Sequence, residues 1–61
     1  MFLIYGRMKN QKRMAPVDLK NGVFVKNLIY ASMFDSQENA QAKCDELNRM
    51  NDDMVFEIRK N

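Results

Sequence analysis

The sequence has 61 residues, 46% hydrophobic and 30% charged, a composition that favours a folded domain over a disordered chain. At this length we expect a single domain over residues 1–61 that buries about 60% of its unfolded surface, so that a partner or a dimer would add stability. The net charge of +2 is divided unevenly, because residues 1–34 hold six basic residues against one acidic residue, whereas residues 35–61 hold four against seven. Such a division favours an anionic partner on one side and a cationic partner on the other.

The residue types exclude several classes of protein. Cys44 is the only cysteine, so no disulfide can form within the chain, which favours the reducing cytoplasm. The N-terminal apolar run is too short for a signal peptide, and no run approaches the roughly 20 apolar residues of a membrane span. We therefore expect a cytoplasmic protein that does not bind a membrane.

Residues 2–8 are predicted to form a strand, since Phe, Leu, Ile and Tyr cluster in a run too short for a helix. Both faces of the run are largely apolar, which favours a position in the interior of a sheet. Gly6 inside the run predicts a bulge or a close approach of another backbone segment, and a bulge is the more common of the two.

Residues 14–19 form a second extended piece, in which Pro16 has no amide hydrogen to donate to a neighbouring strand. This piece is therefore predicted to be an edge strand, a bulged strand or an extended loop. Asn21 and Gly22 follow, and both residue types tolerate the positive φ angles of a type I′ turn. We predict a β-hairpin at these two residues.

Residues 23–34, VFVKNLIYASMF, predict a long strand that is broken or bulged at Lys26 and Asn27. If the alternation holds throughout, one face would be buried, comprising Val23, Val25, Ile29, Ala31 and Met33. A bulge near Asn27 would instead turn Leu28 and Tyr30 inward.

Residues 36–50 predict an amphipathic helix. Asp35 and Glu38 form a capping-box pattern at its start, and Asn51 is predicted to cap its end in the left-handed conformation. The stripe expected to pack on the sheet is narrow and apolar: Ala40, Cys44, Leu47 and Met50. We interpret the cysteine on this stripe as a buried core residue rather than a reactive thiol.

Residues 54–60 show the clearest alternation in the chain. Three side chains are predicted to point inward, Met54, Phe56 and Ile58, and three outward, Val55, Glu57 and Arg59. The chain as a whole predicts an α+β fold, with a mostly antiparallel sheet of three or four strands and one helix on one face, in the order ββ(β)αβ.

No pattern in the sequence predicts catalysis, a metal site or a cofactor site. Because histidine is absent, the usual nucleophilic triads and the Cys/His zinc sites are excluded. The acidic pairs at 45–46 and 52–53 lack the ligand spacing of a calcium loop, and Gly6 and Gly22 are too far apart for a phosphate-binding loop. We expect a protein that is not an enzyme and needs no cofactor.

Two charged surfaces are candidate binding sites. The basic one could engage phosphates, with Tyr5, Phe24 or Tyr30 as stacking platforms, and comprises Arg7, Lys9, Lys12, Arg13 and Lys20. The acidic one is predicted on the helix, could mimic nucleic-acid phosphates, and comprises Glu38, Asp45, Glu46 and Asp53. The alternative interpretation of the basic loop is a solvated surface that keeps a small protein soluble.

In size and layout, with the segment LIYASMFDSQENAQ and the final FEIRK strand, the chain resembles very small proteins of bacteriophages and other mobile elements. Those that are understood are often inhibitors of host machinery, including anti-CRISPR proteins. A weaker similarity, to the DNA-binding arms of phage-type integrases, rests on the basic first half followed by a strand and a capped helix. Those arms end with the helix, and neither resemblance assigns a role to a residue.

We therefore expect a small interaction protein that binds a larger macromolecule, as a phage or mobile-element inhibitor or modulator of a host protein. Its partner would belong to host defence or nucleic-acid-processing machinery. The alternative is a nucleic-acid-binding module that uses the basic residues 7–13 and the sheet aromatics. The sequence leaves open whether the chain forms a homodimer.

Overall fold

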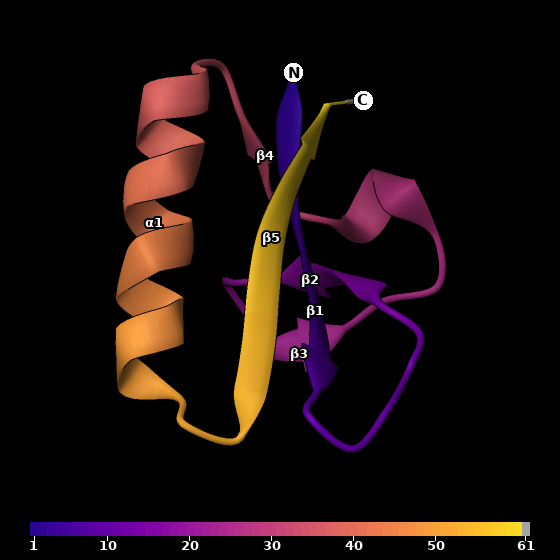
Figure 1. Cartoon of the computed structure of the whole chain (residues 1–61). Coiled ribbons are helices and arrows are strands. Elements are labelled where there is room, and N and C mark those ends of the chain that lie inside the picture. Colours follow the sequence, from indigo (N-terminus) through magenta and orange to yellow (C-terminus); the bar gives the residue numbers. More distant parts are fainter. Residues whose placement is uncertain (61) are drawn as a thin grey trace.

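A computed structural model describes residues 1–60 of the protein. The elements occur in the order β1 (Phe2–Met8), β2 (Ala15–Asp18), β3 (Val23–Phe24), the 3-10 helix η1 (Leu28–Tyr30), β4 (Met33–Phe34), α1 (Gln37–Met50) and β5 (Met54–Lys60). All pairs of neighbouring strands are antiparallel, and α1 lies along one side of the sheet (Figure 1). The predicted α+β fold is confirmed. The predicted strand at 23–34 is divided into β3 and β4.

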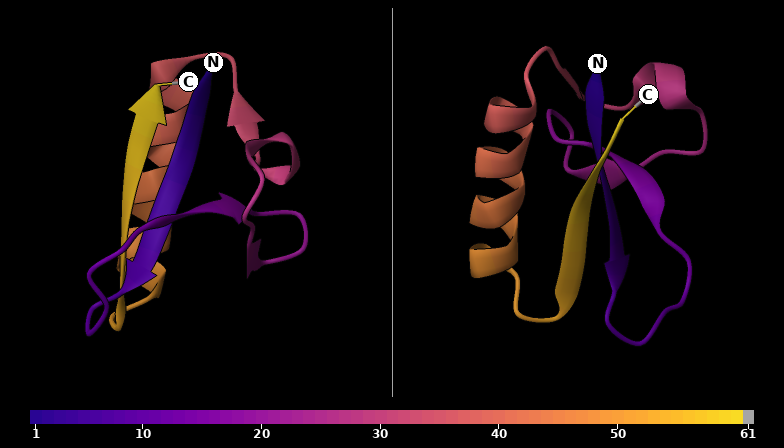
Figure 2. Two further views of the ribbon diagram at one scale, coloured as in Figure 1. Left: turned by 90° about the vertical axis from the view of Figure 1, so that its right-hand side faces the viewer. Right: turned by 45° about the horizontal axis from the view of Figure 1, so that its top comes forward.

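β1 is the central strand of the sheet, as predicted. One of its edges pairs with β5 from Phe2 to Met8. Its other edge is shared, because β4 pairs with Phe2 and Leu3, and β2 pairs with Tyr5 and Gly6. The two views of Figure 2 show β1 and β5 side by side, with the β2–β3 hairpin crossing toward the side of η1. The short strands β2 and β3 therefore bend away from the long pair formed by β1 and β5.

The alternation along β1 and β5 gives the sheet two different faces. On the α1 face, Ile4, Phe56, Val17 and Cys44 of the helix form the buried core. The predicted inward face of β5 is confirmed, because Met54 and Ile58 are half-buried and pack against this core, with Phe56 between them. The opposite face carries Leu3, which is 1% exposed, together with Tyr5 and Arg59, and the segment that contains η1 lies on this side of β1 (Figure 1).

The predicted bulge at Gly6 is wrong. The register with β5 continues through this residue, since Tyr5 pairs with Glu57, Gly6 with Phe56 and Arg7 with Val55. A Cβ atom at Gly6 would lie 2.8 Å from Cδ1 and Cε1 of Phe56 and 3.3 Å from Cε1 of Phe24. Glycine is therefore required here by two aromatic rings that pack on the strand, and not by an irregular backbone.

β2 is a strand with neighbours on both sides, β1 and β3, so of its three predicted forms the edge strand and the loop are wrong. Pro16 is accommodated because its carbonyl, which proline retains, accepts a hydrogen bond from the Val25 amide at 2.9 Å. Residue 16 thus contributes an acceptor to the sheet where it cannot contribute a donor.

The predicted hairpin at Asn21 and Gly22 is confirmed, but the type I′ turn is wrong. A type I′ turn needs positive φ at both residues, and within residues 1–60 only Gly22 has it, at 67°. The loop spans four residues, because the Asp18 carboxylate accepts from the Lys20 amide at 3.0 Å and from the Asn21 side chain at 2.7 Å. An aspartate that binds the amides of its own turn favours this wider loop.

The long strand predicted over residues 23–34 is wrong beyond Phe24, although the break at Lys26 and Asn27 is confirmed. The side chain of Asn27 accepts a hydrogen bond from the Ile29 amide at 3.1 Å and so starts η1. Neither predicted inward set holds. Of the two sets, Ala31 is buried and Val25 half-buried, whereas the others are exposed, namely Val23, Leu28, Ile29, Tyr30 and Met33.

The predicted helix is confirmed, with corrections at its ends. Its N-cap is Ser36, whose side chain accepts from the Asn39 amide at 3.0 Å, and not Asp35 one residue earlier. Asn51 caps the C-terminus in an extended conformation, with φ of −130°, because its side-chain amide donates to the Leu47 carbonyl at 2.9 Å. Met50 lies outside the buried stripe and is 70% exposed.

α1 also closes the outer edge of β5. The Asn48 side chain donates to the Phe56 carbonyl at 3.1 Å and accepts from the Phe56 amide at 2.9 Å. The Asn48 amide thus occupies the position that a further strand would take at this point. An unprotected strand edge is a template for pairing with another chain, so this contact both binds the helix to the sheet and blocks one site of association.

Replacing Asn48 with Ala should lower the free energy of unfolding by about 1–3 kcal/mol, because the Phe56 amide and carbonyl lose their partners. The variant should also self-associate more strongly as its concentration rises, since part of the β5 edge is opened. Urea denaturation and analytical ultracentrifugation measure these effects. Gln41→Ala on the exposed side of α1 is the control and should change stability by no more than about 0.5 kcal/mol. Equal stability of the two variants would contradict the role of Asn48.

Candidate functional site

The basic loop, residues 7–13, is held in shape by its own first cation. Nη1 of Arg7 donates to three carbonyl oxygens, those of Met8 at 3.2 Å, Lys9 at 3.2 Å and Gln11 at 2.9 Å. Arg7 is therefore a structural residue of the loop. Lys9, Lys12 and Arg13 are exposed.

Lys20, the fifth predicted basic residue, is not part of this loop. It is exposed in the turn after β2, whereas the basic loop precedes β2, so the two lie at opposite ends of that strand. The surface of the basic loop is also not purely cationic, because the Lys9 amide donates to the Asp53 carbonyl at 3.0 Å and brings the acidic turn before β5 next to it. The structure thus brings three of the predicted cations together.

The three aromatic residues predicted as stacking platforms have separate environments. The guanidinium of Arg59 lies 4.3 Å from the centroid of the Tyr5 ring and is paired with Glu57 at 2.8 Å. Phe24 lies on the α1 face, over Gly6. Tyr30 on η1 is the most exposed of the three, at 64%.

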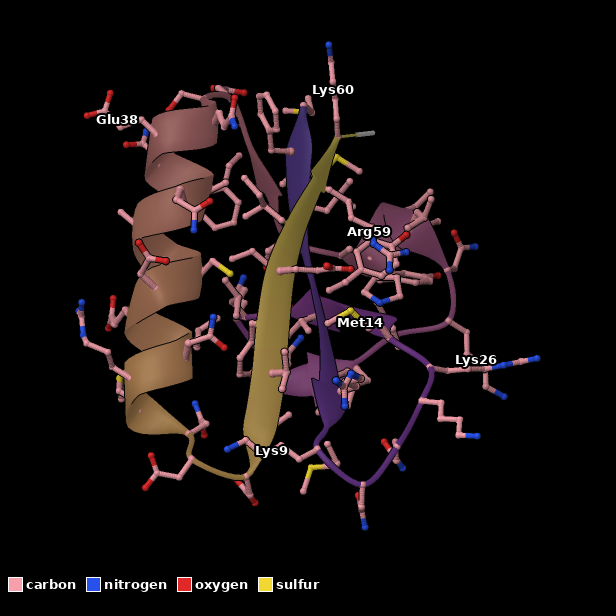
Figure 3. All side chains as sticks on the ribbon, in the orientation of Figure 1. Lys9, Met14, Lys26, Glu38, Arg59 and Lys60 are labelled. Atoms are coloured by element: carbon pink, nitrogen blue, oxygen red, sulfur yellow. The ribbon has the colours of Figure 1, made fainter. Side chains whose placement is uncertain are left out.

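The predicted acidic face is divided over two elements. Glu38 and Asp45 are exposed and lie two helical turns apart on the outer side of α1, where Figure 3 shows Glu38. Glu46 lies about 100° around the helix from Asp45 and approaches the Lys43 ammonium at 3.5 Å. Asp53 lies in the turn between α1 and β5, because the helix ends at Met50.

The thiol of Cys44 is buried, as predicted, with 2% of its surface exposed. Burial raises the pKa of Cys44 above its usual value, and the negative charges of Asp45 and Glu57 raise it further. A thiol with a raised pKa is neutral at pH 7 and is a poor nucleophile. Within residues 1–60 no three His, Cys, Asp or Glu side chains come together as ligands for a metal ion.

Two features of the surface were missed in the sequence. The first is the apolar ridge, which we define as the exposed side chains Leu28, Ile29, Tyr30 and Met33 on η1 and β4. Ile29 is 72% exposed and Tyr30 is 64% exposed. The signal that could have revealed the ridge is Asn27, which is two residues before Ile29 and favours a capped turn over a continuous strand.

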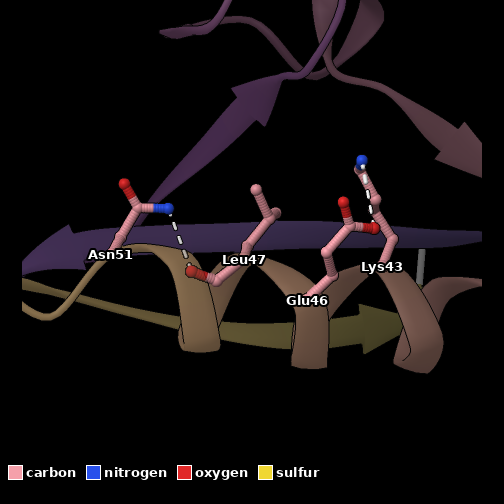
Figure 4. Close-up of polar contacts among 4 residues, drawn as sticks. All are labelled: Lys43, Glu46, Leu47 and Asn51. Carbon is pink, nitrogen blue, oxygen red and sulfur yellow. Dashed lines mark hydrogen bonds and ion pairs between the residues drawn. The ribbon is translucent and has the colours of Figure 1, made fainter.

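The second missed feature is a pocket of about 260 Å³ between α1 and the β2–β3 hairpin. Its wall from the helix is formed by Lys43, Leu47 and Asn51, which lie on the same side of α1 (Figure 4). Its wall from the sheet and hairpin is apolar and includes Phe24 and Phe56. No sequence signal could have revealed it, because the pocket depends on the distance between two elements that are remote along the chain.

Comparison with protein-family models, with curated proteins and with solved structures finds no match to this chain. The arguments about function therefore rest on the geometry of the chain itself. In the part of the chain that the structure describes, no helix combines the length and the apolar character needed to cross a membrane.

The burial of Cys44 predicts how stability depends on pH. Because the pKa is higher in the folded protein than in the unfolded chain, the stability due to the neutral thiol is complete below about pH 8.5 and is lost as the pH rises further. Thermal unfolding of the native protein and of Cys44→Ala between about pH 7 and pH 10 should show a steeper loss for the native protein. The difference between the two proteins removes the contribution of the lysines and tyrosines. Rapid labelling of the native thiol at neutral pH would contradict its burial.

Proposed function

We propose that this chain is a small protein-binding module that docks on a larger protein through the apolar ridge. The observation that carries the proposal is the exposure of Ile29 and Tyr30, two large side chains that this small protein leaves uncovered. Contiguous apolar surface on a soluble protein is typical of a contact site. Aromatic and aliphatic anchors of this kind provide most of the binding energy in protein interfaces.

The ridge is held on a short, well-bonded turn. The Asn27 side chain bonds the Ile29 amide, and the Asn27 carbonyl accepts from the Tyr30 amide at 3.0 Å. On the other side, Ser32 is tied to the end of β2, because its amide donates to the Val17 carbonyl at 3.1 Å and its hydroxyl accepts from the Leu19 amide at 2.8 Å. A surface ordered before binding loses less conformational entropy in a complex, which favours affinity.

The surroundings of the ridge favour a partner with acidic groups around an apolar centre. Lys26 is exposed directly before η1 and projects on the η1 side of the molecule (Figure 3). Arg59 lies in the same row across the sheet as Met33, but its charge is already paired with Glu57, so the preference for acidic groups rests on Lys26. Cations at the rim of an apolar contact raise association rates with acidic partners.

The likeness in size and layout to small phage-encoded inhibitors supports a host protein as this partner. Inhibition of that host protein would follow if the ridge covers a surface that it needs for its own contacts. This part of the proposal rests on the resemblance and on no individual residue.

Ile29→Gln should weaken binding to such a partner more than tenfold, because a central apolar anchor contributes about 2 kcal/mol or more to an interface. Met50→Gln is a matched control, since Met50 is 70% exposed against 72% for Ile29 but lies at the end of α1. Proteins retained from a host lysate on the immobilised native chain would be identified, and their affinities for both variants measured by biolayer interferometry.

The two variants distinguish the ridge from the rest of the surface. Equal loss of binding in both, or no loss with Ile29→Gln, would contradict the proposal. A native chain that retains no protein and does not self-associate in the ultracentrifuge would also contradict it.

Nucleic-acid binding is the second candidate function, and it is favoured by the loop that Arg7 orders. The three hydrogen bonds from this guanidinium fix the loop, and Lys9, Lys12 and Arg13 are left exposed on it. Cations on an ordered loop engage phosphates with little loss of entropy.

Neutralising Lys9, Lys12 and Arg13 together to Gln, with Arg7 retained, tests this candidate. For a short single strand, the slope of log K against log salt should become shallower by about 2 units, since each phosphate contact contributes about 0.7. A control variant with Lys43, Arg49 and Lys60 changed to Gln has the same net charge but an intact basic loop. Equal slopes for the two variants would contradict binding through the loop. Fluorescence anisotropy over a range of salt concentrations measures the slopes.

A further inference from the structure

We infer that the pocket between α1 and the β2–β3 hairpin binds a small carboxylic acid with an apolar body, and that Lys43 holds the carboxylate. The pocket lies on the α1 face, whereas the apolar ridge lies beyond the other side of β1 (Figure 1). The inference is therefore independent of the proposed docking function, because the pocket and the apolar ridge are formed by different residues.

The shape of the pocket follows from the short β3 strand. β3 is two residues long, makes its main contacts with β2, and leaves the space between itself and α1 unfilled. Val23 and Phe24 at this edge are both more than 40% exposed although they are apolar. A ligand in the pocket would cover these side chains and remove their apolar surface from water, which is the main driving force for binding at such a site.

The volume and the lining of the pocket limit the size of the apolar part of the ligand. Seven apolar side chains form most of the wall, namely Val17, Leu19, Val23, Phe24, Leu47, Met54 and Phe56. A cavity of about 150 Å³ with an apolar lining accepts a benzene ring. The volume of about 260 Å³ in this protein therefore suits a ring with a short chain, or a short aliphatic chain.

The one charged side chain in the pocket lining, that of Lys43, favours a negatively charged group on the ligand. Lys43 forms part of the wall, and the ion pair of its ammonium group with Glu46 is weak, because the N–O distance is 3.5 Å and both side chains are about 40% exposed or more. Glu46 is not part of the lining. An anionic ligand can thus replace Glu46 as the partner of Lys43, whereas a cationic ligand would meet an ammonium group of the same sign.

The probe for this site is 3-phenylpropionate, and its control is the isosteric neutral amide, 3-phenylpropanamide. Each is titrated into the 15N-labelled protein while the backbone amide signals are followed by NMR. The expected result is saturable shifts at Gly22, Val23, Phe24, Leu47 and Met54, with the acid bound about threefold more tightly than the amide, the size expected for a partly exposed ion pair. The acid acts here as a free small molecule. N-acetylphenylalanine, which presents the same groups as the end of a protein chain, is the third probe.

Three variants on α1 make the test specific. Lys43→Gln should abolish the preference for the acid over the amide, and Glu46→Gln should increase it about two- to threefold, because it removes the competing carboxylate. Arg49→Gln removes a positive charge from the same helix outside the pocket lining and should leave the preference unchanged. None of these three residues belongs to the buried core, so the variants should fold.

Four results would overturn the inference. They are the absence of shifts at the pocket amides, equal affinity for the acid and the amide, a preference that survives Lys43→Gln, and tighter binding of N-acetylphenylalanine than of 3-phenylpropionate. The last result would assign the pocket to a protein C-terminus instead of a free acid. None of these results depends on whether the apolar ridge binds a protein.

Discussion

The packing of the Phe56 ring against Gly6 is the contact on which the rest of this structure depends. The ring lies so close to β1 that a Cβ atom at residue 6 would be 2.8 Å from two of its carbons. The backbone of the same phenylalanine is bound on its outer side by Asn48 of α1, and Phe24 of the hairpin reaches the same glycine from β3. Phe56 thus contacts β1 and α1, and the same glycine of β1 also contacts Phe24 of β3. In so thin a core few other contacts can replace it, because little apolar surface is available elsewhere.

The parts of the fold that could be predicted from the sequence are those with a local signal. β5 alternates with a period of two, α1 carries a buried pair at Ala40 and Cys44, and β1 is a dense apolar run. The sequence-based predictions are wrong where the backbone conformation is determined by one particular side chain, either distant or adjacent in the sequence. The glycine in β1 is explained by a ring 50 residues away in the sequence, and the turn after β2 by the carboxylate of Asp18. Neither effect has a periodic pattern that a sequence displays.

The same reasoning explains why the apolar ridge is exposed. One helix can cover one face of a sheet, and α1 covers the face that bears Ile4 and Phe56. The segment after β3 contributes Ala31 to the interior, while the side chains of η1 remain in solvent. The alternation in residues 23–34 predicted a buried face because it assumes a continuous strand, and the Asn27 side chain ends that strand. Away from the α1 face only Leu3 and Ala31 are buried, so most of the apolar residues in this segment are left at the surface.

Charge and apolar exposure differ in how much they say about function. A charged side chain is expected at the surface of any soluble protein, so the basic loop and the acid residues of α1 are informative only if they are brought together. The structure keeps three cations on the basic loop but separates the other predicted charges, since Arg7 is used within that loop, Lys20 lies at the far end of β2 and Asp53 lies off the helix. Exposed apolar residues, in contrast, are less expected at a surface, and three of them follow one another along η1. The charged residues of this chain can be identified from its sequence, but only the folded structure shows which apolar side chains remain exposed and can contact a partner.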